Sequence, residues 1–215
     1  MKEDKKYNFE ITRESLIKIR EISDKMEHKT FHFHTHILYD IRTSLGENEI
    51  TYMEIGSYAG GSVSLMSSHP YKTNCYSLDL GNPISPEVVE LNVNKFKNKN
   101  NNFKYFKGNS QDLNMVNQIK NEVKDVDILF IDGDHTRNGV FLDFNNYQDL
   151  VKSGGYICFD DYLDKEFSPE VMGAVDEIVT KMDKNKFNDI GTLHYPLLNE
   201  FTSFEFNSVY IIQKK

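Results

Sequence analysis

The stretch VDILFIDGDHTRNGVFLDF, residues 126–144, runs from a strand through a polar turn into a helix. Its first six residues are mostly apolar, which is typical of a strand buried on both faces. Asp132, Asp134 and His135 follow directly, and the apolar residues beyond them predict a helix over 137–151. A buried strand followed at once by a turn and a helix is the repeating unit of a parallel sheet. The stretch therefore predicts an α/β fold with polar groups at one edge of its sheet.

Units of the same kind occur on both sides of this stretch. Strands are predicted at residues 49–57, 73–81, 103–110, 126–134, 153–162 and 208–215. Helices are predicted between them, at residues 62–69, 85–96, 111–123, 137–151 and 169–182. The low-complexity run KNKNNN, residues 97–102, predicts an exposed turn. The alternation predicts a Rossmann-like, doubly wound, mostly parallel sheet with helices on both faces.

The chain before residue 49 carries a different pattern. Charged residues dominate the first 30 positions, and the apolar residues among them stand at mixed helical spacing, at Ile11, Leu16, Ile17, Ile19 and Ile22. They predict one or two helices outside the main core, followed by another helix that ends at Gly46 as its C-cap. We therefore divide the chain into an N-terminal helical extension or lid, residues 1–48, and a main domain, residues 49–215.

The composition limits the partners and the location of the protein. With 215 residues, the chain is long enough for one sizeable core. The net charge of −8 argues against binding to nucleic acid or to an anionic membrane. The sequence has no run of 18 apolar residues and its first ten residues lack the apolar stretch of a signal peptide, which predicts a cytoplasmic protein. Cys75 and Cys158 fall in apolar stretches and are expected to be buried free thiols.

A glycine-rich turn follows the first predicted strand of the main domain. In EIGSYAGGS, residues 54–62, Gly56, Gly60 and Gly61 permit a tight turn and a close approach of a ligand to the backbone. Asp79 ends the next strand, where a carboxylate in nucleotide-binding folds accepts hydrogen bonds from ribose hydroxyls. The spacing does not match the G-x-G-x-x-G fingerprint of dinucleotide binding. It disfavours a NAD-dependent dehydrogenase, which stays an alternative together with a non-catalytic nucleotide-binding module.

The pattern Glu54-x-Gly56-x-x-x-Gly60 resembles the first motif of the class I S-adenosylmethionine-dependent methyltransferases, and the resemblance extends from about residue 50 to residue 215. It implies a seven-stranded sheet and S-adenosylmethionine as the cofactor. The first motif would hold the methionine half, Asp79 would bind the ribose, and the sequence GNS after the third strand would lie near the adenine. The residues assigned to the cofactor are Glu54, Gly56, Ser57, Tyr58, Gly60, Ser62, Asp79, Asn109, Ser110 and Asp132.

A narrower resemblance comes from FIDGDH, residues 130–135, together with GGYICFDDY, residues 154–162. This pair resembles motifs of the metal-dependent O-methyltransferases of macrolide and aminocoumarin sugar tailoring, which are related to the cephalosporin hydroxylase-like group. The resemblance implies that Asp132, Asp160 and Asp161 bind Mg²⁺ or Mn²⁺.

The chemistry of these three aspartates favours a metal independently of the resemblance. Adjacent parallel strands lie about 4.8 Å apart, so carboxylates at neighbouring strand ends converge. Three carboxylates so close would repel and raise one another's pKa values, and a divalent cation relieves that repulsion. Oxygen ligands alone favour Mg²⁺, Mn²⁺ or Ca²⁺ over zinc. The alternative is that Asp160 and Asp161 cap a loop or pair with lysines.

The same resemblance implies methyl transfer to a hydroxyl group of a small molecule, with a sugar or glycoside as the expected acceptor. A cation would lower the pKa of that hydroxyl, and a nearby base would remove its proton. His135 and Asp134 are the candidate catalytic bases, and His135 is favoured because an imidazole titrates near neutral pH. Catechol-type O-methylation and N-methylation are alternatives with the same cofactor. A homo-oligomer formed through the N-terminal extension is also left open.

Three histidines, His32, His34 and His36, stand shortly before the first strand of the main domain. On a strand they would share one face and could bind a transition metal, whereas on a helix they would spread around the axis. A metal site, a contact to the substrate and a structural role are the open alternatives.

Overall fold

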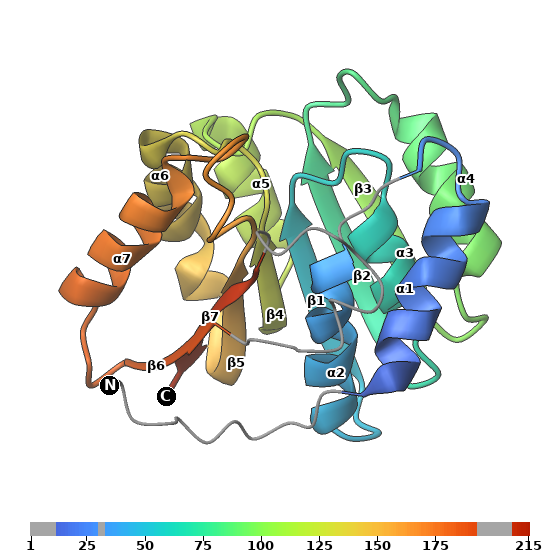
Figure 1. The fold of residues 1–215 in the computed structure, drawn as a ribbon, viewed down its shortest axis with the longest axis horizontal. Helices are drawn as coiled ribbons and strands as arrows, with labels where there is room; N and C mark the ends of the chain where they lie inside the picture. The colour runs from blue at the N-terminus through green and yellow to red at the C-terminus, as the bar shows by residue number, and fades with distance from the viewer. Residues whose placement is uncertain (1–11, 30–32, 193–207) are drawn as a thin grey trace.

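The computed structural model describes residues 12–29, 33–192 and 208–215, which form a seven-stranded sheet in the order β3-β2-β1-β4-β5-β7-β6 (Figure 1). The strands are β1 (Ile50–Ile55), β2 (Thr73–Asp79), β3 (Asn102–Lys107), β4 (Val126–Ile131), β5 (Val151–Phe159), β6 (Phe187–Thr192) and β7 (Tyr210–Lys214). Strands β1 to β5 pair in parallel, and β7 runs antiparallel to both of its neighbours. The predicted mostly parallel, doubly wound α/β fold is confirmed.

Helices cover both faces of this sheet (Figure 1). One face carries α1 (Arg13–Lys25), α2 (His36–Ser44), α3 (Gly61–Ser67) and α4 (Pro86–Phe96). The other carries α5 (Leu113–Glu122), α6 (Arg137–Tyr147) and α7 (Val171–Lys181). Two short 3₁₀ helices, η1 (Phe33–Thr35) and η2 (Gln148–Leu150), precede α2 and β5. Within the described ranges, none of the helices combines the length and the apolar character needed to cross a membrane.

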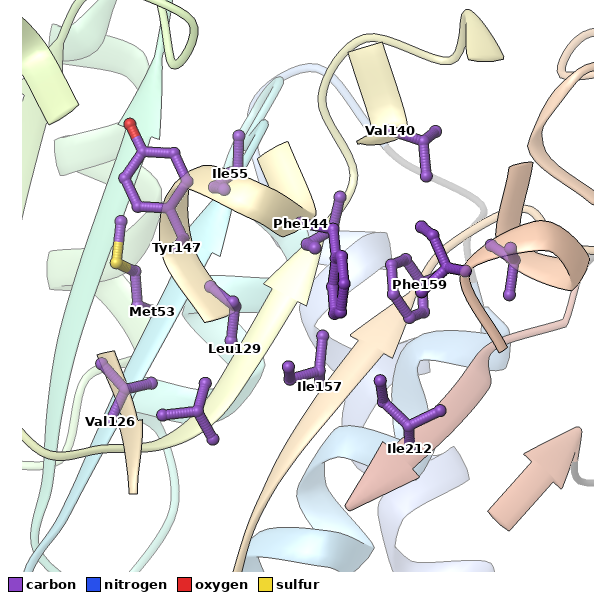
Figure 2. Packing of buried hydrophobic residues seen from close by; sticks show 14 of the residues in the cluster. Met53, Ile55, Val126, Leu129, Val140, Phe144, Tyr147, Ile157, Phe159 and Ile212 are labelled. Carbon is purple, nitrogen blue, oxygen red and sulfur yellow. The ribbon is translucent and has the colours of Figure 1, made fainter. Parts of the chain in front are cut away.

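The central strands divide their side chains between the two faces. In β4, Ile128 and Phe130 join the cluster under α1 to α4, whereas Leu129 and Ile131 join the cluster under α5 to α7. Figure 2 shows Leu129 in the second cluster, together with Phe144 of α6 and Ile157 of β5. This division follows from the two-residue period of a strand, and each such side chain contributes about 1.5–3 kcal/mol when it is fully buried. Every residue of β4 is buried, which explains why the sequence of this strand is mostly apolar.

Helix α1 is part of the main core, so the prediction that it lies outside is wrong. Leu16, Ile19 and Ile22 are each at most 2% exposed, and the last two pack in the same cluster as β1. Their spacing of three residues places them on one side of the helix. A buried hydrogen bond from Ser15 Oγ to Asp40 Oδ2, 2.7 Å long, joins α1 to α2. The sequence revealed the apolar stripe of α1 but not the surface that it covers.

The predicted exposed turn at residues 97–102 is wrong at two positions, because Asn102 begins β3 and Asn101 is buried. Asn101 is 1% exposed, and its amide nitrogen donates to the carbonyls of Ser67 and His69, both at 2.7 Å. Its amide oxygen accepts a hydrogen bond from the Thr73 backbone at 2.8 Å. Buried backbone groups need partners, and this asparagine supplies three of them. A polar residue in a low-complexity run is therefore a structural element of the core.

Several boundaries also differ from the sequence prediction. Helix α6 ends at Tyr147, and Val151, which was assigned to it, begins β5. Asp160 and Asp161 follow β5 instead of belonging to it. Strand β6 was not predicted, because most of its residues are half-exposed and give no alternating pattern. The expectation for the two cysteines is confirmed, since both are buried free thiols.

Candidate functional site

The ends of the parallel strands are held along one edge by a series of backbone hydrogen bonds. The residue after each strand donates to the neighbouring strand: Gly108 to Asp79, Gly56 to Leu78, Asp132 to Ile55 and Asp160 to Ile131, over 2.8–3.0 Å. The strand order reverses between β1 and β4, where ligands bind in open α/β sheets. The polar residues singled out from the sequence therefore lie along the edge of the sheet that forms such crevices.

The turn between β1 and α3 packs directly against the end of β4. Gly56 has a φ of +84°, and a Cβ atom placed on it would lie 1.8 Å from the carbonyl oxygen of Asp132. Gly60 has a φ of +82°, and a Cβ there would lie 2.9 Å from a methyl group of Val89. Both positions need glycine for two reasons, the left-handed backbone and the lack of space.

A cleft of about 590 Å³ opens above this turn, a size typical of small-molecule sites. The predicted cofactor and catalytic residues that line it are Gly56, Tyr58, Asp79, Asn109, Ser110, Asp132, Asp134 and His135. They come from the ends of all four strands β1 to β4. Residues assigned to the cofactor that do not line the cleft are Glu54, Ser57, Gly60 and Ser62.

Asp79 connects the glycine turn to the end of β2. Its Oδ2 accepts the backbone N–H groups of Ser57 at 2.8 Å and Tyr58 at 3.2 Å. Its Oδ1 accepts the N–H of Gly81 at 2.7 Å. An ionised carboxylate offers about four lone-pair positions, so these three bonds leave capacity for a ligand hydroxyl in the cleft.

Glu54 lies behind the cleft and is fully buried. Its carboxylate accepts hydrogen bonds from the hydroxyls of Tyr52, Ser62 and Ser77, at 2.8, 2.7 and 3.0 Å. Burial raises the pKa of Glu54 to about 7, although the three hydroxyls act in the opposite direction. The three donors come from β1, α3 and β2, so Glu54 joins the elements that support the glycine turn. Its assignment to the methionine half of the cofactor stays a prediction.

The three aspartates predicted to bind a metal meet at the ends of β4 and β5. Candidate ligand atoms of Asp132, His135 and Asp161 lie within 4.8 Å of one another, and so do those of His34, Asp160 and Asp161. Asp161 belongs to both groups. Asp160 and Asp161 are buried, at 2% and 3% exposure, while Asp132 is half-buried beside the cleft.

The acidic groups of this cluster raise one another's pKa values. Burial and the neighbouring Asp160 and Asp161 charges raise the pKa of Asp132 well above its usual value. Burial and the charge of Asp160 likewise raise the pKa of Asp161, while His34 and His135 act in the opposite direction. Each ionised carboxylate thus makes the ionisation of the others less favourable.

The cluster fits a divalent cation. Asp161 Oδ1 is buried and has no hydrogen-bond partner among the residues that the structure describes. A buried carboxylate oxygen without a partner is costly, and a cation beside it removes that cost. Carboxylate oxygens suit Mg²⁺ and Mn²⁺, and an imidazole nitrogen is accepted more readily by Mn²⁺.

His34 and His36 point to different partners. His34, in η1, places Nε2 at 2.6 Å from Asp160 Oδ1, and both side chains are buried. Burial lowers the pKa of His34, but the surrounding Asp160, Asp161 and Asp164 charges outweigh it and the net pKa is raised. His36 instead places Nδ1 at 3.2 Å from Asp40 Oδ2, inside the contact between α1 and α2. His32 lies outside the described residues.

The two candidate bases have different surroundings. Asp134 accepts hydrogen bonds from the Thr136 backbone at 3.0 Å and from the Gln111 side chain at 3.1 Å. Burial raises the pKa of Asp134, but these hydrogen bonds outweigh it and the net pKa is lowered. His135 places Nε2 at 3.2 Å from Asp132 Oδ1 and therefore faces the aspartate cluster. Asp134 holds the turn before α6, whereas His135 stands beside the candidate metal ligands.

Two residues of the site were missed by the sequence analysis. Ser168 places Oγ at 2.8 Å from His135 Nδ1 and at 2.8 Å from Asp161 Oδ2. Gln111 contacts Asp134 across the mouth of the cleft. Neither has a sequence signal, because each reaches the site from a loop whose path the sequence does not specify.

Sequence comparisons relate the chain to known proteins. The model of a family described as a methyltransferase domain matches residues 53–162, about half of the chain. Uncharacterized protein R132 of Acanthamoeba polyphaga mimivirus is 38% identical over 175 residues, which cover 80% of this chain and 78% of that protein.

Solved structures of methyltransferases have similar folds. The O-methyltransferase from Bacillus cereus in complex with SAH has a TM-score of 0.64 at 16% identity, with 95% of this chain and 92% of that chain covered. MycE methyltransferase from the mycinamycin biosynthetic pathway, in complex with Mg and SAH, has a TM-score of 0.62 at 17% identity, with coverages of 93% and 54%. An rRNA methylase from Streptococcus thermophilus has a TM-score of 0.60 at 12% identity, with coverages of 84% and 96%. At these identities the likeness concerns the fold.

Proposed function

Because the chain belongs to the class I S-adenosylmethionine-dependent methyltransferases, we propose that it methylates a hydroxyl group of a small molecule with the help of Mg²⁺ or Mn²⁺. The observation that carries this proposal is that the ligand atoms of Asp161 converge with those of Asp132 and His135, which line the cleft, and also with those of His34 and Asp160. A bound cation lowers the pKa of a hydroxyl that coordinates it, so we assign this cation site to the acceptor.

The cleft residues hold and orient the methyl donor. Asp79 is suited to accept a ribose hydroxyl, and Gly56 lets the backbone approach the donor closely. Asn109 and Ser110 also line the cleft, and the adenine is proposed to lie near them. S-adenosylmethionine supplies a methyl group that is already electrophilic, so the protein's main task is to align it with the acceptor oxygen.

The aspartate cluster and His135 act on the acceptor. Asp132, Asp160 and Asp161 would hold the cation, which lowers the pKa of a hydroxyl bound to it and fixes its direction. His135 then removes the hydroxyl proton, a role that typically contributes about 10²–10⁴-fold to the rate. Asp134 is less suited to this role, because hydrogen bonds engage both of its oxygens and its pKa is lowered.

A sugar or glycoside is the proposed acceptor. The motif pair that supplies the three aspartates resembles the sugar O-methyltransferases, and MycE, one of the proteins with a similar fold, was solved with Mg. The net charge of −8 disfavours an RNA acceptor, although rRNA methylases share the fold. The segment before residue 49 is proposed to line the acceptor side, which is supported by the contact of His34 with Asp160.

The test combines a binding experiment with a screen of acceptors. Calorimetry should show S-adenosylmethionine binding without metal, and turnover of a sugar or glycoside should require Mg²⁺ or Mn²⁺ and stop with EDTA. Asp161→Asn should abolish turnover even with Mg²⁺ or Mn²⁺ present, because it removes a proposed ligand of the cation. Asp149→Asn, at an exposed aspartate of η2, should leave turnover and its dependence on the cation unchanged. Full turnover in EDTA would contradict the metal-assisted reaction, and turnover of aromatic diols alone would indicate a catechol-type acceptor.

A further inference from the structure

Asp143 is a buried carboxylate that the proposed reaction does not use. It is 0% exposed, and neither of its oxygens has a hydrogen-bond partner within the described part of the chain. Val140, Phe144 and Tyr147, on the same side of α6, are packed in the core (Figure 2). A carboxylate in such surroundings costs stability, and proteins tolerate such costs mainly at functional sites. Asp143 is therefore a candidate for a role in the site.

The carboxylate of Asp143 lies directly behind the wall of the cleft. A Cβ atom placed on Gly133 would lie 3.0 Å from Asp143 Oδ2, and Gly133 lines the cleft. The hydroxyl of Ser110, another residue that lines the cleft, is also near the carboxylate. Because Asp143 itself is fully buried, it can act on a ligand in the cleft only through the residues of this wall.

Helix α6 holds Ser110 from one side. Tyr147 Oη donates to the carbonyl of Ser110 at 2.9 Å, and Asn146 Nδ2 donates to the same oxygen at 3.4 Å. Positions 143, 146 and 147 are three or four residues apart, or adjacent, so they lie on the same side of the helix. Two residues of α6 therefore fix the backbone of Ser110, while Asp143 stands beside its hydroxyl.

The chemistry of these two groups sets the direction of a hydrogen bond between them. Burial raises the pKa of Asp143 to about 6, so the group is ionised at pH 8. An ionised carboxylate only accepts hydrogen bonds, whereas a hydroxyl carries one hydrogen and two lone pairs. Once Ser110 gives its hydrogen to Asp143, its oxygen can only accept a hydrogen bond from a ligand. The 6-amino group of adenine donates such a bond, whereas hypoxanthine carries a carbonyl oxygen at that position.

We infer that Asp143 is a positioning residue that accepts the hydrogen of the Ser110 hydroxyl and thereby makes Ser110 Oγ the acceptor for the 6-amino group of the bound methyl donor. The pair makes the site selective for adenine over hypoxanthine. This inference rests on the proposed function, in which the adenine lies near Asn109 and Ser110. It also gives a reason for a buried carboxylate that lowers the stability of the fold.

Calorimetry with two demethylated donors tests the inference without any turnover. S-adenosylhomocysteine carries adenine, and S-inosylhomocysteine differs from it only in carrying hypoxanthine. At pH 8 the wild type should bind the adenine compound about 10–100-fold more tightly, as expected when a hydrogen-bond donor is replaced by an acceptor. In Asp143→Ala this ratio should fall by about 3–10-fold, because the freed hydrogen of Ser110 can turn to the hypoxanthine carbonyl. Equal binding of both compounds by the wild type, or an unchanged ratio in Asp143→Ala, would overturn the inference.

Further variants separate positioning from a structural role. Ser110→Ala should lower the ratio as much as Asp143→Ala, and the double variant should lower it no further, because the two residues act as a unit. Additive losses would contradict the link between them. Asp143→Asn keeps an oxygen that can accept the hydroxyl and should recover part of the preference. Asp127→Asn, at another buried aspartate, which pairs with Lys152, should leave the ratio unchanged.

Two further results keep these tests separate from folding and from the proposed reaction. Should Asp143→Ala fail to fold in a thermal unfolding control, Asp143→Val fills the space with an apolar side chain and provides the same test. A protein that prefers adenine through Asp143 but methylates no hydroxyl acceptor would support the role of Asp143 and overturn the proposed reaction. Hydroxyl methylation by a wild type that binds both compounds equally would do the reverse.

Discussion

The imidazole of His34 connects a segment that precedes the sheet to the carboxylate that follows β5. Its contact with Asp160 spans 126 positions in the sequence, and both partners are buried. From the sequence, Asp132, Asp160 and Asp161 could be placed together, because each follows a buried strand of a parallel sheet. The partners of His34 and Ser168 could not be predicted, since the path of a loop through space leaves no periodic pattern.

The contact with Asp160 predicts that His34 supports metal binding. Hydrogen-bond partners that orient a metal-binding carboxylate typically contribute about 10–100-fold to metal affinity. His34→Ala should therefore weaken the binding of Mn²⁺ by that factor, as measured by calorimetry on the metal-free protein. His28→Asn is a suitable control, because His28 is exposed and asparagine tolerates its φ of 52°. Equal Mn²⁺ affinity in His34→Ala and the wild type would contradict this role.

At the scale of elements, the turn from β1 into α3 could be predicted well and the edges of the fold less well. EIGSYAGGS combines an apolar strand end with closely spaced glycines, a local signal that the structure explains through positive φ angles and a lack of space. Strand β6 has no comparable signal, because it is half-exposed. Helix α1 gave the correct secondary structure but the wrong location, since an apolar stripe does not identify the surface on which it packs.

Substitutions at Gly56, in this turn, and at Gly154, in β5, form a matched pair. Gly56 and Gly154 have nearly the same φ, +84° and +83°, but a Cβ at Gly154 would meet nothing within 4 Å. Gly154→Ala should cost only the strain of a left-handed backbone, about 1–2 kcal/mol in the free energy of unfolding. Gly56→Ala also forces the turn away from β4 and should cost at least about 4 kcal/mol. Chemical denaturation measures both, and similar losses would mean that the close contact with Asp132 is easily relaxed.

At the scale of the whole molecule, the fold holds several ionisable groups at a cost. Asp143 in α6 is fully buried, and neither of its oxygens has a hydrogen-bond partner among the residues described. Burial raises the pKa of Asp143 to about 6, and the nearby Ser110 hydroxyl opposes this only in part. Asp143 therefore binds a proton more tightly in the folded protein than in the unfolded chain.

This predicts that the contribution of Asp143 to stability falls as the pH rises. A carboxyl group whose pKa is higher in the folded state than in the unfolded state binds more protons when folded, so the free energy of unfolding falls between about pH 4 and pH 6 and stays lower above that. For Asp143 alone the loss is on the order of 3 kcal/mol. Asp143→Asn should remove this pH-dependent loss and raise the free energy of unfolding at pH 7, as measured by denaturation at several pH values. Asp149→Asn should do neither. If the difference in the free energy of unfolding between Asp143→Asn and the wild type stayed constant from pH 4 to pH 8, the raised pKa of Asp143 would be contradicted.

Binding of a cation should raise the stability of the whole chain. A ligand at 100 times its Kd that binds only the folded state adds about 2.7 kcal/mol, which for a protein of this size corresponds to an increase of about 5–10 °C in Tm. Thermal unfolding in Mn²⁺ and in EDTA measures this difference. Asp161→Asn should abolish most of it, and an equal increase in that variant would show that the cation binds elsewhere.

The packing of α1 and α2 has a consequence for how such a protein can acquire new substrates. Because Ile19 and Ile22 share one hydrophobic cluster with β1, the segment before the sheet is part of the core and is not an independent folding unit. Expression of the chain from residue 49 onward would leave apolar surface open to water and invite aggregation. Recombination that exchanges the N-terminal segment would therefore endanger the fold itself, and single substitutions at the surface of that segment are the better way to test its proposed role in acceptor choice.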